Sequence, residues 1–342
     1  GLTLPRELGG MNAPMLVYFM NSELMARADV STMAHHGFHG GIAMAALVFS
    51  AFEGTSDIDP ATGRINETRW RKLIEEIAAG EAWGCMDITE PDAGSDMAAL
   101  RAVGEQDADG NWFVTGENIF ITSGHGKYHF VIARTEETDL DDPMGGLNGL
   151  SMFLVPTYED DAEGNRRRIV QLSRVEEKLG HHGSATCGLV YDRAPAELVG
   201  KRGEGFKYML TLMNNARIGV GFACLGLSES AYRAAVDYAA ERASMGKTID
   251  RHEMIAEYLD TMQTEIQGIR AMAVTACYHE EMAQKLAMAV RYGDLEGDEL
   301  EQLEGQMKSH QKKARRITPL LKYFAAEKAV EHARTSLQIH GG

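Results

Sequence analysis

The sequence lacks several features that would place it in a membrane or outside the cell. It contains no apolar run of the roughly 18–20 residues that a membrane-spanning helix needs. Its first residues do not show the basic segment and apolar core of a secretory signal. Cysteine is scarce, and no two cysteines form a Cys-x-x-Cys pair, which predicts a reducing, cytoplasmic setting and no structural metal. The four are Cys85, Cys187, Cys224 and Cys277.

Positively charged residues are also fewer than negatively charged ones. The chain has 34 Lys and Arg against 50 Asp and Glu, which gives a formal net charge of −16. Because nucleic-acid binding needs a clustered cationic face, this balance argues against a nucleic-acid partner. The 44% hydrophobic and 25% charged content is ordinary for a globular protein, and 342 residues suffice for two or three domains.

The first of three compositional zones, residues 1–83, is predicted to be helical. Residues 16–52 are rich in Ala and Met with few turn signals, and Asp29 or Ser31 can cap a helix there. A loop at 57–63 leads to a probable helix over 67–79, which should end at Gly80.

The second zone, residues 84–198, changes to strand-like patterns. Short apolar runs are separated by turn signals at 109–111 and 145–146, and no helix of ten residues interrupts them. We expect a compact antiparallel sheet or barrel. The runs are residues 112–115, 119–122, 129–133, 150–155 and 187–191.

The third zone, residues 199–342, returns to a helical period. Apolar residues at 255, 259, 262, 266 and 269 follow a 4, 3, 4, 3 spacing, which puts them on one helix face. We predict a four-helix bundle, with the acidic 293–305 and basic 308–316 segments as a solvated connection between its third and fourth helices. The fold class is therefore predicted to be α+β, with N-terminal helices, a central β domain and a C-terminal bundle.

The segment Met-Asp-Ile-Thr-Glu-Pro-Asp-Ala-Gly-Ser-Asp, residues 86–96, carries the strongest chemical signal. Pro91 removes a backbone donor and stops the strand, and Gly94 allows a close approach to a ligand. The hydroxyls of Thr89 and Ser95 can bond a flavin edge or a thioester-linked cofactor arm. By itself, the same pattern also suits an ordinary strand and turn.

Taken with the helix–sheet–helix order, this motif resembles the acyl-CoA dehydrogenase family over nearly the whole chain. Glu-Lys-Leu-Gly-His-His-Gly-Ser at 177–184 and Met-Asn-Asn-Ala-Arg at 213–217 suggest the large 3-methylmercaptopropionyl-CoA dehydrogenase-like subgroup. The resemblance implies an FAD enzyme that removes two hydrogens across Cα–Cβ of an acyl-CoA thioester. It also implies an electron-transfer flavoprotein, or a similar acceptor, as the partner that takes the electrons.

The resemblance implies a flavin contact by two segments of the β domain. Ile88 and Thr89 would contact the ring, with Thr89 bonding its pyrimidine edge. Phe120, Ile121 and Thr122 match an aromatic-Ile-Thr strand in which Phe120 packs by the ring and Thr122 bonds N5. Relatives often have Trp at the position of Phe120. The phenyl ring of this chain can still stack on the flavin, but it lacks the N–H donor of an indole. Without the resemblance, 119–122 is also typical of a strand with one buried face.

The substrate contacts implied by the resemblance lie on two segments. Ser95 would bond the cofactor or the pantetheine arm of the substrate. Asn214 and Arg217 would face the CoA, because the forked guanidinium of Arg suits phosphate. Many relatives carry Asp at the position of Asn214, so this chain lacks that negative charge.

Five further cofactor contacts are implied near the ends of the bundle helices. Arg242 lies in a Glu-Arg-Ala-Ser-Met-Gly-Lys turn and would reach the FAD pyrophosphate of a neighbouring subunit, and His252 would lie against the cofactor. Gln338 with Gly341 and Gly342 would close over a neighbour's FAD. The resemblance therefore implies a homodimer or homotetramer.

The family chemistry needs a carboxylate as general base. A minority of relatives place it immediately before the arginine matched by Arg217, where this chain has Ala216. In most relatives it lies a short way beyond the Gly-Gly matched by Gly341 and Gly342. The resemblance therefore implies no catalytic base within 1–342 and a glutamate beyond Gly342, and both ends of the sequence read as cut. No metal site is expected, because the spacing of His35, His36, His39, His181 and His182 fits no zinc pattern.

Two alternatives remain open at this point. One is an acyl-CoA or nitroalkane oxidase on the same scaffold, which would pass electrons directly to oxygen. The other is a non-catalytic, DNA-associated relative, against which the net charge argues.

Overall fold

The computed structural model describes residues 1–137, 145–161 and 163–341. Its contacts divide the chain into two compact units. The first contains Gly1–Asn12 and His35–Met213, and the second contains Ala13–Ala34 and Asn214–Gly342. The chain passes from one unit to the other within α2 (Val30–Glu53) and again within α5 (Gly205–Glu241). The division into domains at 1–83, 84–198 and 199–342 stays a prediction.

The helices predicted at the N-terminal end are present. α1 (Met15–Ala28) and α2 are separated at Asp29, whose Oδ1 accepts the Thr32 N–H at 2.6 Å and so caps α2, as predicted. α3 (Arg71–Ala79) ends at Gly80 with a φ of 80°, also as predicted. It starts later than predicted because the residues before it form a small hairpin of β1 (Asp57–Ile58) and β2 (Ile65–Glu67). The first unit also contains two short 3₁₀ turns, η1 (Arg6–Leu8) and η2 (Met97–Ala99).

Seven strands of the first unit pair into one sheet, and five of them close into a barrel. β11 pairs with β5, β5 with β4, β4 with β6, β6 with β7, and β7 again with β11. The expected β domain is confirmed, and most of its pairs are antiparallel. β3 is the main exception, because it runs parallel to β6. The strands are β3 (Gly84–Asp87), β4 (Val103–Gln106), β5 (Trp112–Thr122), β6 (Tyr128–Arg134), β7 (Leu150–Pro156), β10 (Gln171–Val175) and β11 (Thr186–Val199).

Three short features lie between these strands. The predicted turn at 109–111 joins β4 to β5, with Gly110 at a φ of 89°. Residues 145–146, predicted as a turn, instead begin the four-residue helix α4 (Gly145–Asn148). β8 (Tyr158–Asp160) and β9 (Arg166–Arg168) form a separate hairpin. No helix longer than four residues lies between β3 and β11 in the described part of that segment.

The sheet has an apolar cluster on each of its faces. The inner one includes Val114, Val131, Phe153 and Leu189, all without exposed surface. The other joins the sheet to the N-terminal helices, for example through Phe49, Trp70 and Phe130.

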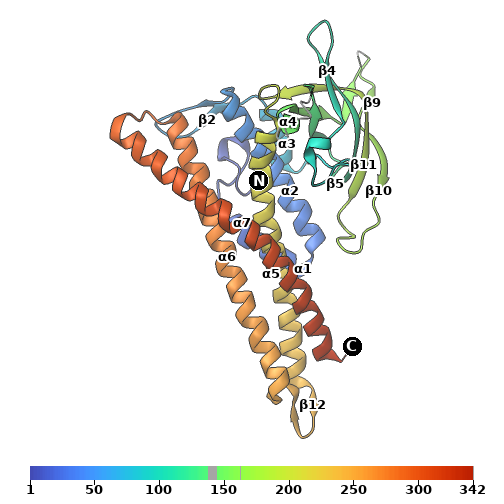
Figure 1. Cartoon of the computed structure of the whole chain (residues 1–342), viewed down its shortest axis with the longest axis vertical. Coiled ribbons are helices and arrows are strands. Elements are labelled where there is room, and N and C mark those ends of the chain that lie inside the picture. The colour runs from blue at the N-terminus through green and yellow to red at the C-terminus, as the bar shows by residue number, and fades with distance from the viewer. Residues whose placement is uncertain (138–144, 162, 342) are drawn as a thin grey trace. The chain divides into compact units, whose positions relative to one another are not determined.

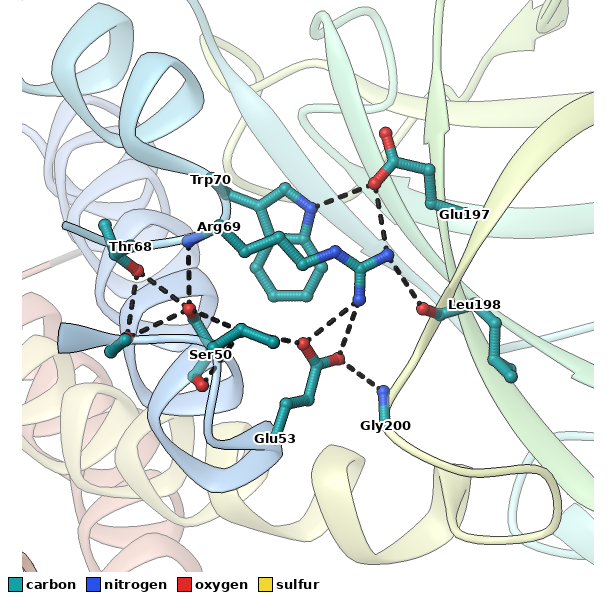
Figure 2. Close-up of polar contacts among 10 residues, drawn as sticks. Ser50, Glu53, Thr68, Arg69, Trp70, Glu197, Leu198 and Gly200 are labelled. Atoms are coloured by element: carbon teal, nitrogen blue, oxygen red, sulfur yellow. Dashed lines mark hydrogen bonds and ion pairs between the residues drawn. The ribbon is translucent and has the colours of Figure 1, made fainter.

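A polar network reinforces this second contact and is drawn in Figure 2. The Arg69 guanidinium donates to Glu53 at 3.0 and 3.1 Å and to the Leu198 carbonyl at 3.1 Å. Glu53 also accepts the Gly200 N–H at 2.5 Å, and Trp70 Nε1 donates to Glu197 at 3.3 Å. These bonds connect the end of α2 and the start of α3 to the end of β11.

The second unit consists mainly of long helices, and here the predicted architecture needs a correction. The segment after α5 contributes α6 (Glu253–Tyr292) and α7 (Gly297–His340), so the described residues 199–341 form three long helices instead of four. The fourth helix of the unit is α1, from the N-terminal end. α6 and α7 run side by side (Figure 1).

The charged segments predicted to be a solvated connection form part of α7. Only residues 293–296 connect α6 to α7. The acidic and basic stretches are rich in Glu, Gln, Leu and Lys, which are good helix formers, and their charges pair along the helix. Lys308 Nζ, for example, lies 2.8 Å from Glu304 Oε2, one turn away.

The apolar stripe predicted on α6 is confirmed. Met262, Ile266 and Ile269 are buried, and Ile255 and Leu259 pack against a smaller cluster at the start of the helix. Among the described residues, no helix combines the length and the apolarity that crossing a bilayer demands.

Candidate active site

The structure brings the two predicted flavin-contacting segments together. The chain leaves the sheet after β3, and the Thr89 carbonyl accepts the Ile119 N–H at 2.8 Å and Asn118 Nδ2 at 3.2 Å. Ile88 and Thr89 are half-buried. The segment that follows β3 is therefore fixed beside the last residues of β5.

A β-bulge in β5 turns Phe120 outward. Cys187 of β11 is opposite Ile121, but Leu189 is opposite Asn118, so two residues of β5 face one residue of β11. Phe120 has a φ of 61°, a conformation that costs energy for an aromatic residue, and its side chain is 58% exposed. Strained residues of this kind cluster at functional sites.

The neighbours of Phe120 point in different directions. Ile121 is buried in the barrel core, and Thr122 is half-buried at the end of β5. The bulge therefore presents an aromatic ring and nearby hydroxyls at one edge of the barrel.

Glu90 holds the turn that contains the Thr-Glu-Pro motif. Its two carboxylate oxygens accept the N–H groups of Arg101 and Ala102, each at 2.8 Å. Its backbone pairs with Ala93 through two hydrogen bonds. Both oxygens are committed to the backbone, so Glu90 is a structural carboxylate. Ser95 lies on the exposed side of the same turn.

Sequence reasoning considered His35 and His39 only as metal ligands and missed their place beside this site. His35 Nδ1 lies 2.9 Å from Ser123 Oγ, and its Nε2 accepts the Ala185 N–H at 3.2 Å. The rings of His35 and His39 contact Trp83, with centroids 4.9 and 4.4 Å away. α2 is thereby attached to the end of β5. The spacing of four residues, which puts both rings on one helix face, was the available signal.

Burial affects the protonation of this histidine cluster. It lowers the pKa of His39 to about 4 and also lowers the pKa values of His35 and His125, and the charges of neighbouring groups add to the shift. These rings are therefore neutral at pH 7, and they add aromatic surface to the edge of the barrel beside Thr122.

The predicted CoA contacts lie one turn apart on α5. Arg217 Nη1 donates to Asn214 Oδ1 at 3.2 Å, and both side chains are half-buried. This bond orients the guanidinium along the helix surface. Ala216, at the place where some relatives have a base, is half-buried on the same turn.

The remaining predicted cofactor residues gather at one end of the second unit. Arg242 follows α5 and is exposed at the start of the hairpin of β12 (Ala243–Ser244) and β13 (Lys247–Thr248). The Arg242 carbonyl accepts the Ile249 N–H at 2.8 Å, at the 3₁₀ turn η3 (Ile249–Arg251). His252 Nε2 lies 3.0 Å from the Ser244 carbonyl, which fixes the ring under the hairpin.

The C-terminal end of α7 reaches the same place. Ile339 packs against Ala235 and Ala239 of α5, and the ring of His340 stacks on Tyr238 at 4.5 Å. Gln338 is exposed, and its carbonyl accepts the N–H of Gly341, which has a φ of 85°. Gly342 lies outside the described residues.

The predicted residues thus form two groups, one in each unit. We call Ile88, Thr89, Phe120, Ile121 and Thr122 the barrel-edge group. We call Arg242, His252, Gln338 and Gly341 the helix-end group.

Two family models match the chain. One, described as the middle domain of acyl-CoA dehydrogenase, covers residues 85–194, and the other, its C-terminal domain, covers residues 203–292. Among curated relatives, 3-methylmercaptopropionyl-CoA dehydrogenase of Ruegeria pomeroyi is 30% identical over all of this chain and 55% of its own length. Acyl-CoA dehydrogenase of Bacillus subtilis is 27% identical over all of this chain and 76% of its own length.

Solved structures share the fold. Acyl-CoA dehydrogenase complexed with FAD from Bacillus anthracis matches with a TM-score of 0.76 and 23% identity, over all of this chain and 52% of that one. Butyryl-CoA dehydrogenase from Megasphaera elsdenii matches with a TM-score of 0.68 and 20% identity, over 95% and 86% of the two chains. The chain spans about half the length of the Ruegeria relative. The motif, the fold and the two family models agree, and the chain belongs to the acyl-CoA dehydrogenase family.

Proposed function

We propose that the chain is an FAD-dependent acyl-CoA dehydrogenase that converts an acyl-CoA thioester to a trans-2-enoyl-CoA. The observation that carries the proposal is the bulge that exposes Phe120 beside Thr89 and Thr122. An exposed aromatic ring flanked by hydroxyls suits a flat, polar-edged ring system such as isoalloxazine.

The barrel-edge group would hold the flavin ring of FAD. Phe120 would stack on the ring, while Thr89 and Thr122 would bond its pyrimidine edge and N5. Bound FAD supplies a hydride acceptor for the β-carbon of the substrate. Ile88 would complete the contact beside the Thr89–Ile119 hydrogen bond, and Ile121, whose side chain lies in the barrel core, would contribute only its backbone.

The helix-end group would hold the diphosphate part of an FAD bound by a second copy of the chain. Arg242 is exposed there, and its guanidinium suits a phosphate oxygen. Gly341 adopts a left-handed conformation without a side chain, which lets a cofactor approach the backbone. His252, Gln338 and Gly342 belong to the same proposed contact, which makes a homodimer or homotetramer part of the proposal.

The substrate side of the proposal rests on Ser95, Asn214 and Arg217. Ser95 is exposed on the turn next to Thr89 and would bond the pantetheine arm. Arg217, oriented by Asn214, would reach a CoA phosphate. The Ruegeria relative acts on 3-methylmercaptopropionyl-CoA by its name, which favours a short acyl chain.

No described residue of this chain is assigned as the base that removes the α-proton. Glu90 is excluded because both of its oxygens bond backbone N–H groups, and Ala216 has no proton acceptor. The base must be a carboxylate that reaches the α-carbon of a bound thioester.

The electrons would pass to an electron-transfer flavoprotein or a similar acceptor. Slow reoxidation of the reduced flavin by oxygen would support this proposal, and fast reoxidation would support an oxidase instead. Two relatives are named as reductases, acryloyl-CoA reductase (NADH) of Anaerotignum propionicum and 3-(aryl)acrylate reductase of Clostridium sporogenes. Assays in both directions are therefore needed.

The test is a visible absorbance spectrum of the complete protein before and after anaerobic addition of a short-chain acyl-CoA. A flavin band that bleaches on addition is the expected result. A flavin band that persists with every acyl-CoA would contradict dehydrogenation and leave flavin binding intact. A protein that takes up no FAD would contradict the cofactor assignment itself.

A further inference from the structure

A polar cluster lies inside the barrel, where nearly all other side chains are apolar. Cys85 and Asp87 lie on β3 and His129 lies on β6, and none of the three has exposed surface. The strands are parallel neighbours with Cys85 opposite His129. Because side chains alternate along a strand, Cys85 and Asp87 point to the same inner face.

The three side chains bring their donor atoms together. His129 Nδ1 lies 2.7 Å from Asp87 Oδ2 and 3.0 Å from Cys85 Sγ. All three donor atoms lie within 4.8 Å of one another, close enough to share one ion.

The hydrogen bonds around His129 define its tautomer. The Thr157 hydroxyl donates its one proton to the Gly126 carbonyl, so it can only accept from His129 Nε2, 2.7 Å away. Nε2 therefore carries a hydrogen, and Nδ1, which shares a proton with Asp87 Oδ2 across their 2.7 Å contact, offers a lone pair once that proton leaves. An outer partner that fixes the tautomer in this way is typical of histidines that bind metal.

Asp87 is oriented in a similar way. The Tyr191 hydroxyl donates to Asp87 Oδ2, whereas Oδ1 is buried and has no hydrogen-bond partner among the described residues. A buried polar atom without a partner costs about 1–3 kcal/mol. Asp87 therefore keeps one buried oxygen without a partner among the described residues, which gives the cluster an energetic reason to bind an ion.

We propose that Cys85, Asp87 and His129 bind a zinc ion that links β3 to β6 inside the barrel. A thiolate, an imidazole and a carboxylate are zinc ligands, and the sulfur argues against magnesium or calcium. Binding requires the cluster to release two protons to solvent, the one on the Cys85 thiol and the one shared by His129 Nδ1 and Asp87 Oδ2. The two anionic ligands then balance the charge of the dication, so the closed barrel gains no net charge.

The position of the cluster gives the ion a structural role. Asp87 is the last residue of β3, and Ile88 and Thr89 follow directly. A metal bond at Asp87 would fix the point where the chain leaves the sheet. Because the site is closed to solvent, we expect the ion to enter while the barrel folds.

The pattern of the sequence could not show this site. Cys85 and Asp87 are separated by one residue, but His129 lies 42 positions beyond Asp87 and reaches them only through the parallel β3–β6 pairing.

The test measures metal in the full chain without reference to catalysis. The protein is refolded with Zn²⁺ or Co²⁺, dialysed and analysed for bound metal. We expect about one ion per chain, since one cluster of three possible ligands lies among the described residues, and a cobalt–thiolate charge-transfer band in the Co²⁺ form. A folded wild-type chain that retains no metal would overturn the proposal, whatever the variants do.

Variants assign the ligands. Cys85→Ser and Asp87→Asn should lose the ion, and Cys85→Ser should lose the charge-transfer band even where some cobalt stays bound. Cys277→Ser removes another buried thiol, on α6, and should keep both the metal and the band. An unchanged band in folded Cys85→Ser, or its loss in Cys277→Ser, would contradict the assignment.

Discussion

At the scale of single residues, a mutation of Phe120 should affect function and leave stability nearly unchanged. Its ring is 58% exposed, so removing it takes little apolar surface out of the core. If the ring stacks on a flavin, Phe120→Ala should weaken FAD binding by about 2- to 10-fold, the value of an aromatic pair. Phe120→Trp should keep or improve the affinity.

The measurement is an FAD titration of the unloaded protein, followed by flavin fluorescence. Val175→Ala is the matched control, because Val175 is equally exposed on β10 and lies outside the barrel-edge group. An affinity for FAD that Phe120→Ala leaves unchanged would remove Phe120 from the site.

His39 makes a second prediction at this scale, for the pH dependence of stability. Burial lowers the pKa of His39 from the ordinary 6.5 to about 4 in the folded chain. Between these two pH values the unfolded chain binds more protons, so the stabilisation is complete above pH 6.5 and is lost as the pH falls toward 4. His39→Leu should therefore show a flatter dependence of Tm on pH in this window, by a few degrees.

The comparison requires Tm at intervals from pH 4 to pH 7.5 for both proteins. His182→Leu serves as the control, since His182 is exposed in the loop before β11. Parallel curves for wild type and His39→Leu would show that His39 does not titrate as described.

At the scale of secondary-structure elements, two glycines on long helices should respond in opposite ways to alanine. On α5, a Cβ at Gly226 would lie 2.6 Å from the Glu23 carbonyl and 2.7 Å from Ala26 Cβ of α1. Gly226→Ala should therefore push α1 from α5 and destabilise the protein by about 1–3 kcal/mol. On α6, Gly268 has open space around it, and Gly268→Ala should stabilise by about 0.5–1 kcal/mol.

Each variant is the control for the other, because both make the same chemical change in a helix interior. Urea unfolding of the two variants and the wild type would measure the difference. Destabilisation by both would mean that Gly268 also contacts a neighbour, and stabilisation by both would mean that α1 does not pack closely on α5.

Some secondary-structure elements could be predicted from the sequence and others could not. Apolar runs and turn residues were enough to locate most strands, and Gly80 marked the end of α3. The bulge at Phe120 was not predictable, because it depends on which residues of β11 lie opposite β5. The count of helices was wrong because three helices were predicted before residue 293, where the described chain has only α5 and α6. The predicted connection was too long because the charged stretch after residue 296 looked like a loop, although charges one turn apart stabilise a helix.

For the site, prediction depended on the resemblance more than on pattern. The barrel-edge residues lie together because the Thr89 carbonyl bonds Ile119, a contact between residues 30 positions apart. The helix-end residues lie together because α5, α6 and α7 meet at one end. No sequence motif predicts the cluster of Cys85, Asp87 and His129, because only the parallel pairing of two strands brings these residues together.

At the scale of the whole molecule, the proposed flavin site needs two copies of the chain. The barrel-edge group of one copy would bind the ring, and the helix-end group of the other would bind the diphosphate. Phe120→Ala damages the first contribution, and Arg242→Ala damages the second. In a mixed dimer of the two variants, one site would contain both defects and the other would contain neither. Random pairing should therefore restore about a quarter of all sites to full affinity.

The experiment unfolds the two variants, refolds them together and measures FAD retained after gel filtration, beside each variant refolded alone. A double variant, Phe120→Ala with Arg242→Ala, refolded with wild type is the matched control. Every site in its mixed dimers has one defect, so about a quarter of its sites should be intact, all from wild-type pairs. About half would be intact if each site lay within one chain. The prediction is wrong if the co-refolded single variants retain no more FAD than the average of the two variants refolded alone. In that case Phe120 of one copy and Arg242 of the other do not form one site across an interface.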